Sequence, residues 1–137
     1  MATFVKFEPF VEHLAEGVHN LQTGAITVAL SATAPTTSWA TLSQVTQISY
    51  TNLSSRLCTV ASSAQTAGTY KLTINDLVLT ASGAVATFRY VILYNDTPTS
   101  PADPLIGYYD YGQDVTLANG ETFTLNFDDT NGVLTLA

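Results

Sequence analysis

The sequence predicts a mainly β protein, an antiparallel β-sandwich or open barrel with one or two short α-helices. Short apolar or alternating runs are separated by Gly, Pro, Asn and Asp, which is typical of strands and turns. Only two stretches have helical spacing. The 137 residues are 46% hydrophobic, enough for a core without disulfides or metal. We expect a single domain over residues 1–137, with seven or eight strands and residues 1–7 as an extended N-terminal arm.

The first helical stretch lies between Phe7 and Val18. Pro9 suits a first helical turn and Gly17 suits the end of a helix. The apolar positions at helical spacing are Phe7, Phe10, Val11, Leu14 and Val18. The other face carries Glu8, Glu12, His13 and Glu16. The pattern predicts one amphipathic helix whose charged face is solvated surface.

The next elements are a strand and a second short helix. Residues 25–32 alternate, with Ile26, Val28 and Leu30 on one face. Trp39, Leu42, Val45 and Ile48 then recur every three residues behind a cap at Thr37 or Ser38. This spacing predicts a second helix that Trp39 anchors to a sheet. Residues 50–67, rich in Ser, Thr and Ala, fit a strand, a loop or an arm reaching a neighbouring molecule.

The middle of the chain alternates with one break. Tyr70, Leu72 and Ile74 share a face, and the pattern resumes one residue out of phase over residues 77–80. A β-bulge at residues 75–76 explains this shift. Residues 86–94 then begin as a half-buried strand and become apolar on both faces. We therefore expect this strand at the centre of a sheet.

The C-terminal part predicts an antiparallel meander. Residues 105–111 resume the β pattern after a loop with three prolines, so they are an expected neighbour of the central strand. Asn119-Gly120 predicts a two-residue hairpin between residues 115–117 and 121–127. Phe123, Leu125 and Phe127 share the expected core face of that last run. Residues 128–132 read as a turn, and residues 133–136 as a final strand.

Composition and charge disfavour several functions. The net charge is −7 and no basic residue follows Arg89, which argues against nucleic-acid binding. No apolar run is long enough for a membrane span, so no membrane partner is expected. Cys58 reads as a small buried hydrophobe. His13 and His19 would lie on different faces of a helix. No nucleophile, metal or cofactor set can be assembled, so we expect neither cofactor nor metal and no enzyme activity.

Two blocks of sequence carry a family resemblance. FRYVILYND, LIGYYDYG, NGETFTLNF and a terminal GVLTLA form one block, and FVEHLAEGVHNLQTGAITVALSATAP forms the other. Together they resemble the small β-rich virion proteins of tailed bacteriophages, either capsid decoration (cement) proteins or head fibres. The likeness covers both ends of the chain, with a looser middle. Its motifs are structural and name no catalytic residue.

The resemblance implies a virion structural protein that cements the capsid from outside and is made in the host cytoplasm. The expected partners are the major capsid protein and further copies in a homotrimer, which residues 105–111 and 121–127 would join. The alternative is a head-fibre, tail or adsorption protein that binds a host glycan through its tyrosines, with Asp110 as a polar partner. The candidate interface residues are Phe4, Phe7, Arg56, Tyr108, Tyr109 and Tyr111.

Overall fold

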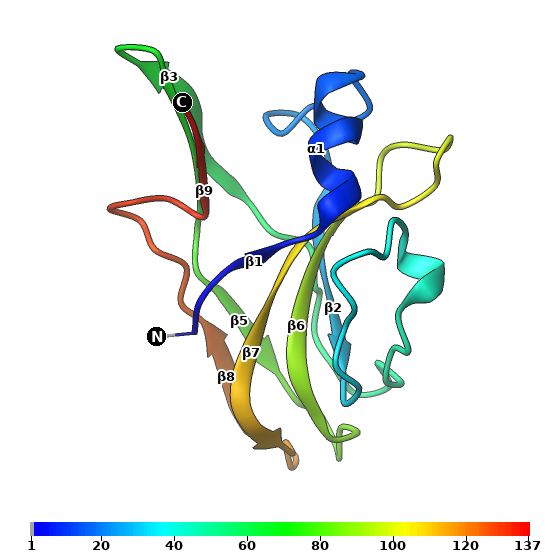
Figure 1. The fold of residues 1–137 in the computed structure, drawn as a ribbon. Coiled ribbons are helices and arrows are strands. Elements are labelled where there is room, and N and C mark those ends of the chain that lie inside the picture. The colour runs from blue at the N-terminus through cyan, green and yellow to red at the C-terminus, as the bar shows by residue number, and fades with distance from the viewer. Residues whose placement is uncertain (1) are drawn as a thin grey trace.

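The protein is mainly β, with open antiparallel sheets and one short α-helix, as the sequence predicts. The computed structural model describes residues 2–137. Their elements are β1 (Val5–Lys6), α1 (Glu8–Ala15), β2 (Ile26–Ser31), the 3-10 turn η1 (Leu42–Gln44), β3 (Val60–Thr66), β4 (Thr69–Ile74), β5 (Leu77–Thr80), β6 (Phe88–Asn95), β7 (Leu105–Val115), β8 (Thr122–Leu125) and β9 (Leu134–Leu136). Figure 1 shows their arrangement, with no closed barrel among them.

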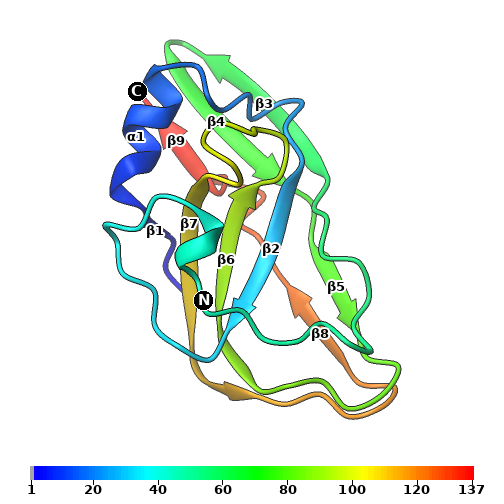
Figure 2. The same ribbon diagram turned by 90° about the vertical axis from the view of Figure 1, so that its right-hand side faces the viewer.

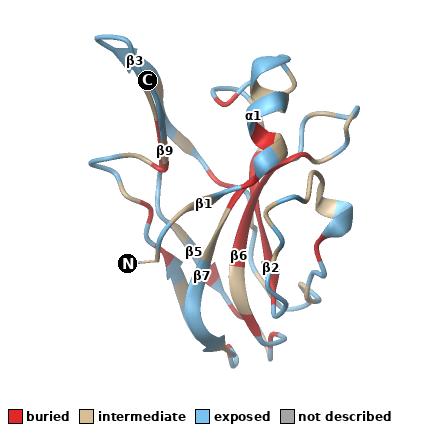
Figure 3. Cartoon of the chain, viewed as in Figure 1, coloured by how far each residue is buried: buried red, intermediate tan, exposed pale blue. Residues whose placement is uncertain are grey.

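The main sheet has the order β1-β7-β6-β2, so β6 lies inside it as expected. Strand β6 pairs antiparallel with β2, where Val28 lies opposite Leu93, and with β7, where Tyr109 lies opposite Val91. Residues 91–95 are buried, because other parts of the chain cover both faces of the strand here. All of them except Asn95 are apolar. Figure 3 shows the burial concentrated on β2, β6 and the start of β7.

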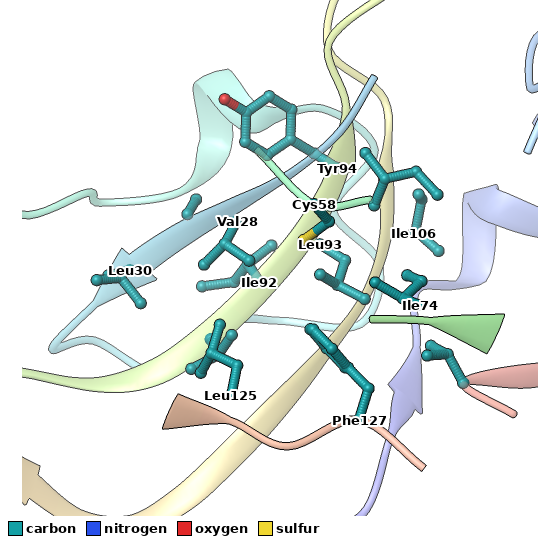
Figure 4. Packing of buried hydrophobic residues seen from close by; sticks show 14 of the residues in the cluster. Val28, Leu30, Cys58, Ile74, Ile92, Leu93, Tyr94, Ile106, Leu125 and Phe127 are labelled. Atoms are coloured by element: carbon teal, nitrogen blue, oxygen red, sulfur yellow. The ribbon is translucent and has the colours of Figure 1, made fainter. Parts of the chain in front are cut away.

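The second layer is the β5-β8 ribbon, which packs against the main sheet (Figure 2). Phe88 of β6 meets Phe123 of β8 edge to face, with ring centroids 5.4 Å apart. Leu93, Leu125 and Phe127 belong to the hydrophobic core, and so does Ile92, which as the adjacent residue along β6 lies on the opposite face of the main sheet from Leu93 (Figure 4). The domain is therefore held together by aromatic and aliphatic side chains that alternate along strands from different sheets.

The strands β3, β4 and β9 form a separate sheet that projects from the body, which we call the arm (Figure 1). Its hairpin closes at Ala67 and Gly68, with φ of 51° and 84°. Two consecutive positive φ angles are those of a type I′ turn. An Ala-Gly pair is a weaker signal of this turn than Asn-Gly, and the sequence alone did not point to it.

Asn119-Gly120 was the predicted hairpin turn, and this prediction is wrong. Gly120 has a φ of 85°, and the N–H of Glu121 donates to the carbonyl of Ala118 across the turn. Strands β7 and β8 do not pair along their described residues; β8 pairs with β5, Phe123 lying opposite Leu79. The turn carries the chain from one sheet to the other, so the predicted meander is broken there.

The predicted bulge at residues 75–76 is also a change of sheet. Strand β4 ends at Ile74 in the arm and β5 begins at Leu77 in the second layer. The Asp76 carboxylate accepts the N–H of Phe127 at 3.0 Å and holds this corner. A shift of alternation by one residue is what either a bulge or a corner produces, and the pairing partners decided between them.

The helical predictions were partly right. Helix α1 lies where expected, but Val11 is 50% exposed, and Phe10 is the buried member of its apolar positions. The predicted second helix is wrong: residues 39–48 contain a single 3-10 turn capped by Thr41 and Gln44 rather than by Thr37 or Ser38. The backbone instead pairs with other segments, since Ile48 donates to the carbonyl of Leu30.

Residues 50–58 cross the outer edge of β2 and protect it. Val28 donates its N–H to the carbonyl of Arg56, and Cys58 donates to the carbonyl of Ile26, both at 2.9 Å. At the other edge of the sheet, Val5 of the predicted N-terminal arm lies opposite Tyr108 of β7. Short segments thus cover the outer edge of β2 and the first part of β7, which limits edge-to-edge aggregation at these places.

We expect truncation in β6 to test this core. Ile92 is fully buried at the centre of the main sheet. Ile92→Ala should lower the free energy of unfolding by about 2 to 5 kcal/mol, because it leaves a cavity in a packed core. Val78→Ala, at a position 49% exposed, is the control and should cost under about 0.5 kcal/mol. Urea denaturation measures both, and equal losses would contradict the assigned core.

Candidate functional site

A groove with a volume of about 380 Å³ lies between the main sheet and β8. We call it the aromatic groove. Its size lies within the usual range for small-molecule sites. It is lined by Ala2, Val91, Tyr109, Tyr111, Phe123, Thr124, Leu125, Asn126 and Phe127.

Alternation along two strands builds the aromatic groove. Tyr109 and Tyr111 stand on one side of β7, while Phe123 and Phe127 come from β8 and the residues after it. Tyr111 meets Phe123 edge to face at 5.0 Å between centroids, and Tyr109 meets Phe127 at 6.1 Å. Tyr111 remains 46% exposed. The groove therefore offers aromatic surface to a ligand without opening the core.

The surroundings of Tyr109 in the aromatic groove keep its phenol group neutral. Burial raises the pKa of Tyr109 to about 12, and the nearby carboxylate of Asp128 acts in the same direction. Tyr109 is therefore a hydrogen-bond donor at neutral pH. Arg89 donates two hydrogen bonds to Asp110, at 2.8 and 3.1 Å, and these lower the pKa of that carboxyl. Asp110 is thus already engaged by an arginine.

The other predicted interface residues serve the fold. Phe7 is fully buried, and its ring lies 5.4 Å from that of Tyr108. Phe4 is half-buried 5.6 Å from the ring of Tyr109. Arg56 lies over the Tyr50 ring, 3.6 Å from its centroid, and donates to the carbonyl of Val28. A partner could reach Phe7 only if the N-terminal segment left the domain.

A second surface lies on the arm. Tyr70 is opposite Leu136 and Leu72 is opposite Leu134, so these four side chains share one side of the arm sheet. We call this side the arm face. Leu72 is fully buried at the base, whereas Leu136 is 55% exposed near the tip. The sequence predicted the alternation of these side chains. It did not predict that the arm face is exposed, because exposure depends on which elements lie opposite that face.

His13 and His19 lie together, although the sequence placed them apart. The chain turns back at Gly17 after α1 ends, so the two rings are 6.2 Å apart. The Asn95 amide reaches His19 Nδ1 at 3.3 Å. Neither His13 Nδ1 nor His19 Nε2 has a hydrogen-bond partner among residues 2–137. Burial, and next the neighbouring His13, lower the pKa of His19 to about 4.

The remaining reactive groups form no shared site. Residues 2–137 hold no cluster of three or more His, Cys, Asp or Glu side chains that could bind a metal ion. Cys58 is buried as expected, and burial raises the pKa of its thiol to about 12. Asp128 accepts N–H groups from Thr130 and Asn131, closing a turn on itself. Within the same residues, no helix has the length and apolar character needed to cross a membrane.

Comparison with protein-family models, with curated proteins and with solved structures found no match to this chain.

We expect the buried histidine to make the protein acid-sensitive. The folded state holds His19 with a pKa near 4, against 6.5 in the unfolded chain, so only the unfolded chain gains a proton between these values. Stability should fall as the pH drops from about 6.5 to about 4, by roughly 2 to 3 kcal/mol. Asp110 and Asp128, whose pKa values are lowered, add their losses only below their ordinary 3.8.

Urea denaturation between pH 7 and pH 4.5 measures this effect. His19→Gln keeps a polar side chain that cannot titrate, so its stability should vary much less over this range. His13→Gln is the matched control, because it removes a neighbouring histidine but leaves His19 buried. A wild-type slope that persisted in His19→Gln would show that another group causes the acid sensitivity.

Proposed function

We propose that this chain is a virion structural protein of a tailed bacteriophage that decorates and cements the capsid by bridging subunits of the major capsid protein. The observation that carries the proposal is the arm, a small sheet that projects from the domain with Leu136 exposed on its face. A compact domain normally buries such a sheet against another layer. An apolar face held away from the body fits docking onto a neighbouring molecule.

Composition supports the same role. Charged residues make up 11% of the chain, which is low for a solitary soluble domain. Apolar area that a capsid subunit covers contributes about 25 cal/mol per Å². Repeated attachment over a lattice multiplies this through high effective concentration, so weak single contacts still resist internal pressure. No chemical step is needed for this mechanism.

A homotrimer at three-fold positions of the lattice is part of this proposal. The two segments expected to join the copies, residues 105–111 and 121–127, line opposite sides of the aromatic groove in one chain. Part of their aromatic surface is used within the chain, and Tyr111 keeps the largest exposed share. A neighbouring copy would therefore contact the groove at Tyr111 rather than at the half-buried Tyr109.

A binding assay with undecorated heads of the encoding phage tests the capsid role. Wild-type protein should co-sediment with heads, and Leu136→Ser should weaken this binding by about tenfold or more, because it removes exposed apolar area from the arm face. Val78→Ser is the matched control, since Val78 is 49% exposed on β5. Failure of the wild type to bind heads, or equal loss in both variants, would contradict the proposal.

The second candidate function is glycan binding, favoured by the aromatic groove. Sugars stack on aromatic rings, and Tyr111 and Phe123 provide partly exposed rings at one end of the groove. Thr124 and Asn126 add exposed polar side chains beside them. The same domain could present this groove to the host surface from a head fibre or tail position.

A glycan array or host-cell binding assay with the isolated protein tests this second function. Any glycan bound should be lost in Tyr111→Ala and kept in Leu136→Ser, because these residues lie on the groove and the arm respectively. Binding to heads should instead be weakened in Leu136→Ser. Tight binding to heads with no glycan bound would exclude the glycan function.

A further inference from the structure

The outer edge of β3 has unpaired backbone groups. Among the described residues β3 pairs with β4 alone, and the arm has the order β3-β4-β9. The two-residue turn makes Thr66 and Thr69 the hydrogen-bonded pair that closes the hairpin. Hydrogen-bonded and non-hydrogen-bonded pairs then alternate, so Ser63 and Gln65 direct their N–H and C=O groups away from β4.

This edge lacks the features that usually protect an edge strand. Native proteins place Lys, Pro or a covering segment along such edges. Strand β3 reads VASSAQT, and no charged residue occurs between Arg56 and Lys71. Its register shifts between Val60 and Ser62, but residues 62–66 pair regularly with β4 and are mostly exposed. By contrast, residues 50–58 cover the outer edge of β2, and β1 pairs with β7 at Gly107 and Tyr108.

We propose that β3 pairs antiparallel with β3 of a second copy of this chain, about a two-fold axis at Ser63. The net charge of −7 makes two copies repel over most of their surfaces, and β3 is an uncharged place where they can meet. The strand is also self-complementary in this register. Ser63 lies opposite Ser63, Ser62 opposite Ala64, and Ala61 opposite Gln65, with no like charges facing each other.

The position of the arm permits this pairing. The hairpin end of the arm projects away from α1 and the main sheet, so a second arm can approach the edge of β3 there (Figure 1). Pairing would give one sheet of order β9-β4-β3-β3-β4-β9. The two-fold axis is perpendicular to that sheet, so both arm faces lie on its same side. The exposed Leu136 side chains of two copies would then belong to one larger apolar surface.

The pairing of one short strand buries little area, so the free dimer should be weak and concentration-dependent. It is a two-fold contact and does not itself close a trimer. On a lattice it would link copies at neighbouring positions, where their high effective concentration strengthens it. The pairing does not depend on the capsid role, because it uses only the backbone edge of β3.

Cysteine cross-linking tests the register directly. Ser63→Cys is made in a Cys58→Ser background, and Thr135→Cys in the same background is the control, exposed on the opposite edge of the arm. Ser63→Cys should form the cross-linked dimer at least about tenfold faster than the control under mild oxidation, because paired strands bring its Cα atoms within disulfide range. Equal rates would overturn the proposal.

Sedimentation over a concentration series provides the second readout. Wild-type protein should show a reversible monomer–dimer equilibrium, and Ser63→Lys should remain monomeric because it places two ammonium groups opposite each other. Thr135→Lys adds the same charge at the other edge and should dimerise like the wild type. Circular dichroism checks that both variants are folded. A wild-type monomer at every concentration, or a dimer unaffected by Ser63→Lys, would also overturn the proposal.

Discussion

The fold depends on the burial of β6 on both faces. Its backbone is hydrogen-bonded to β2 on one side and to β7 on the other. Residues 91–95 are all buried, and Asn95 at the end of the strand is the one with a polar amide side chain. A strand in this position must satisfy every backbone group through its neighbours, since no water can do so. The registers of β2 and β7 are therefore fixed by their hydrogen bonds to β6. Residues 50–58 and β1 then pair with the outer sides of these two strands.

The two surfaces with functional interest lie where this packing ends. The aromatic groove forms where the chain leaves the main sheet after β7 and enters β8 in the second layer, so tyrosines from β7 face phenylalanines from another layer. The arm forms where β4 separates from β5 at Asp76, so its apolar face continues past the core that buries its base. Both surfaces are thus consequences of strands changing sheets.

Three shifted pKa values have the same main cause. For His19, Tyr109 and Cys58 the largest cause is burial, which favours the neutral form of each group. A neutral imidazole, phenol and thiol pack well in an apolar interior and contribute little as nucleophiles or charged ligands. In a chain with few charges, these groups serve stability, and the contacts proposed above depend on apolar surface and on unpaired backbone.

The sequence by itself located several of the local elements. Alternation located β2, β6 and β7, the apolar run to Tyr94 identified β6 as central, and Pro9 and Gly17 bounded α1. Tertiary structure alone decided the pairing: β7 and β8 lie in different sheets despite Asn119-Gly120, and His13 meets His19 across a turn. Periodicity shows which faces of a strand are apolar, but it does not show which distant strand covers them. Strand pairing depends on packing across the whole chain.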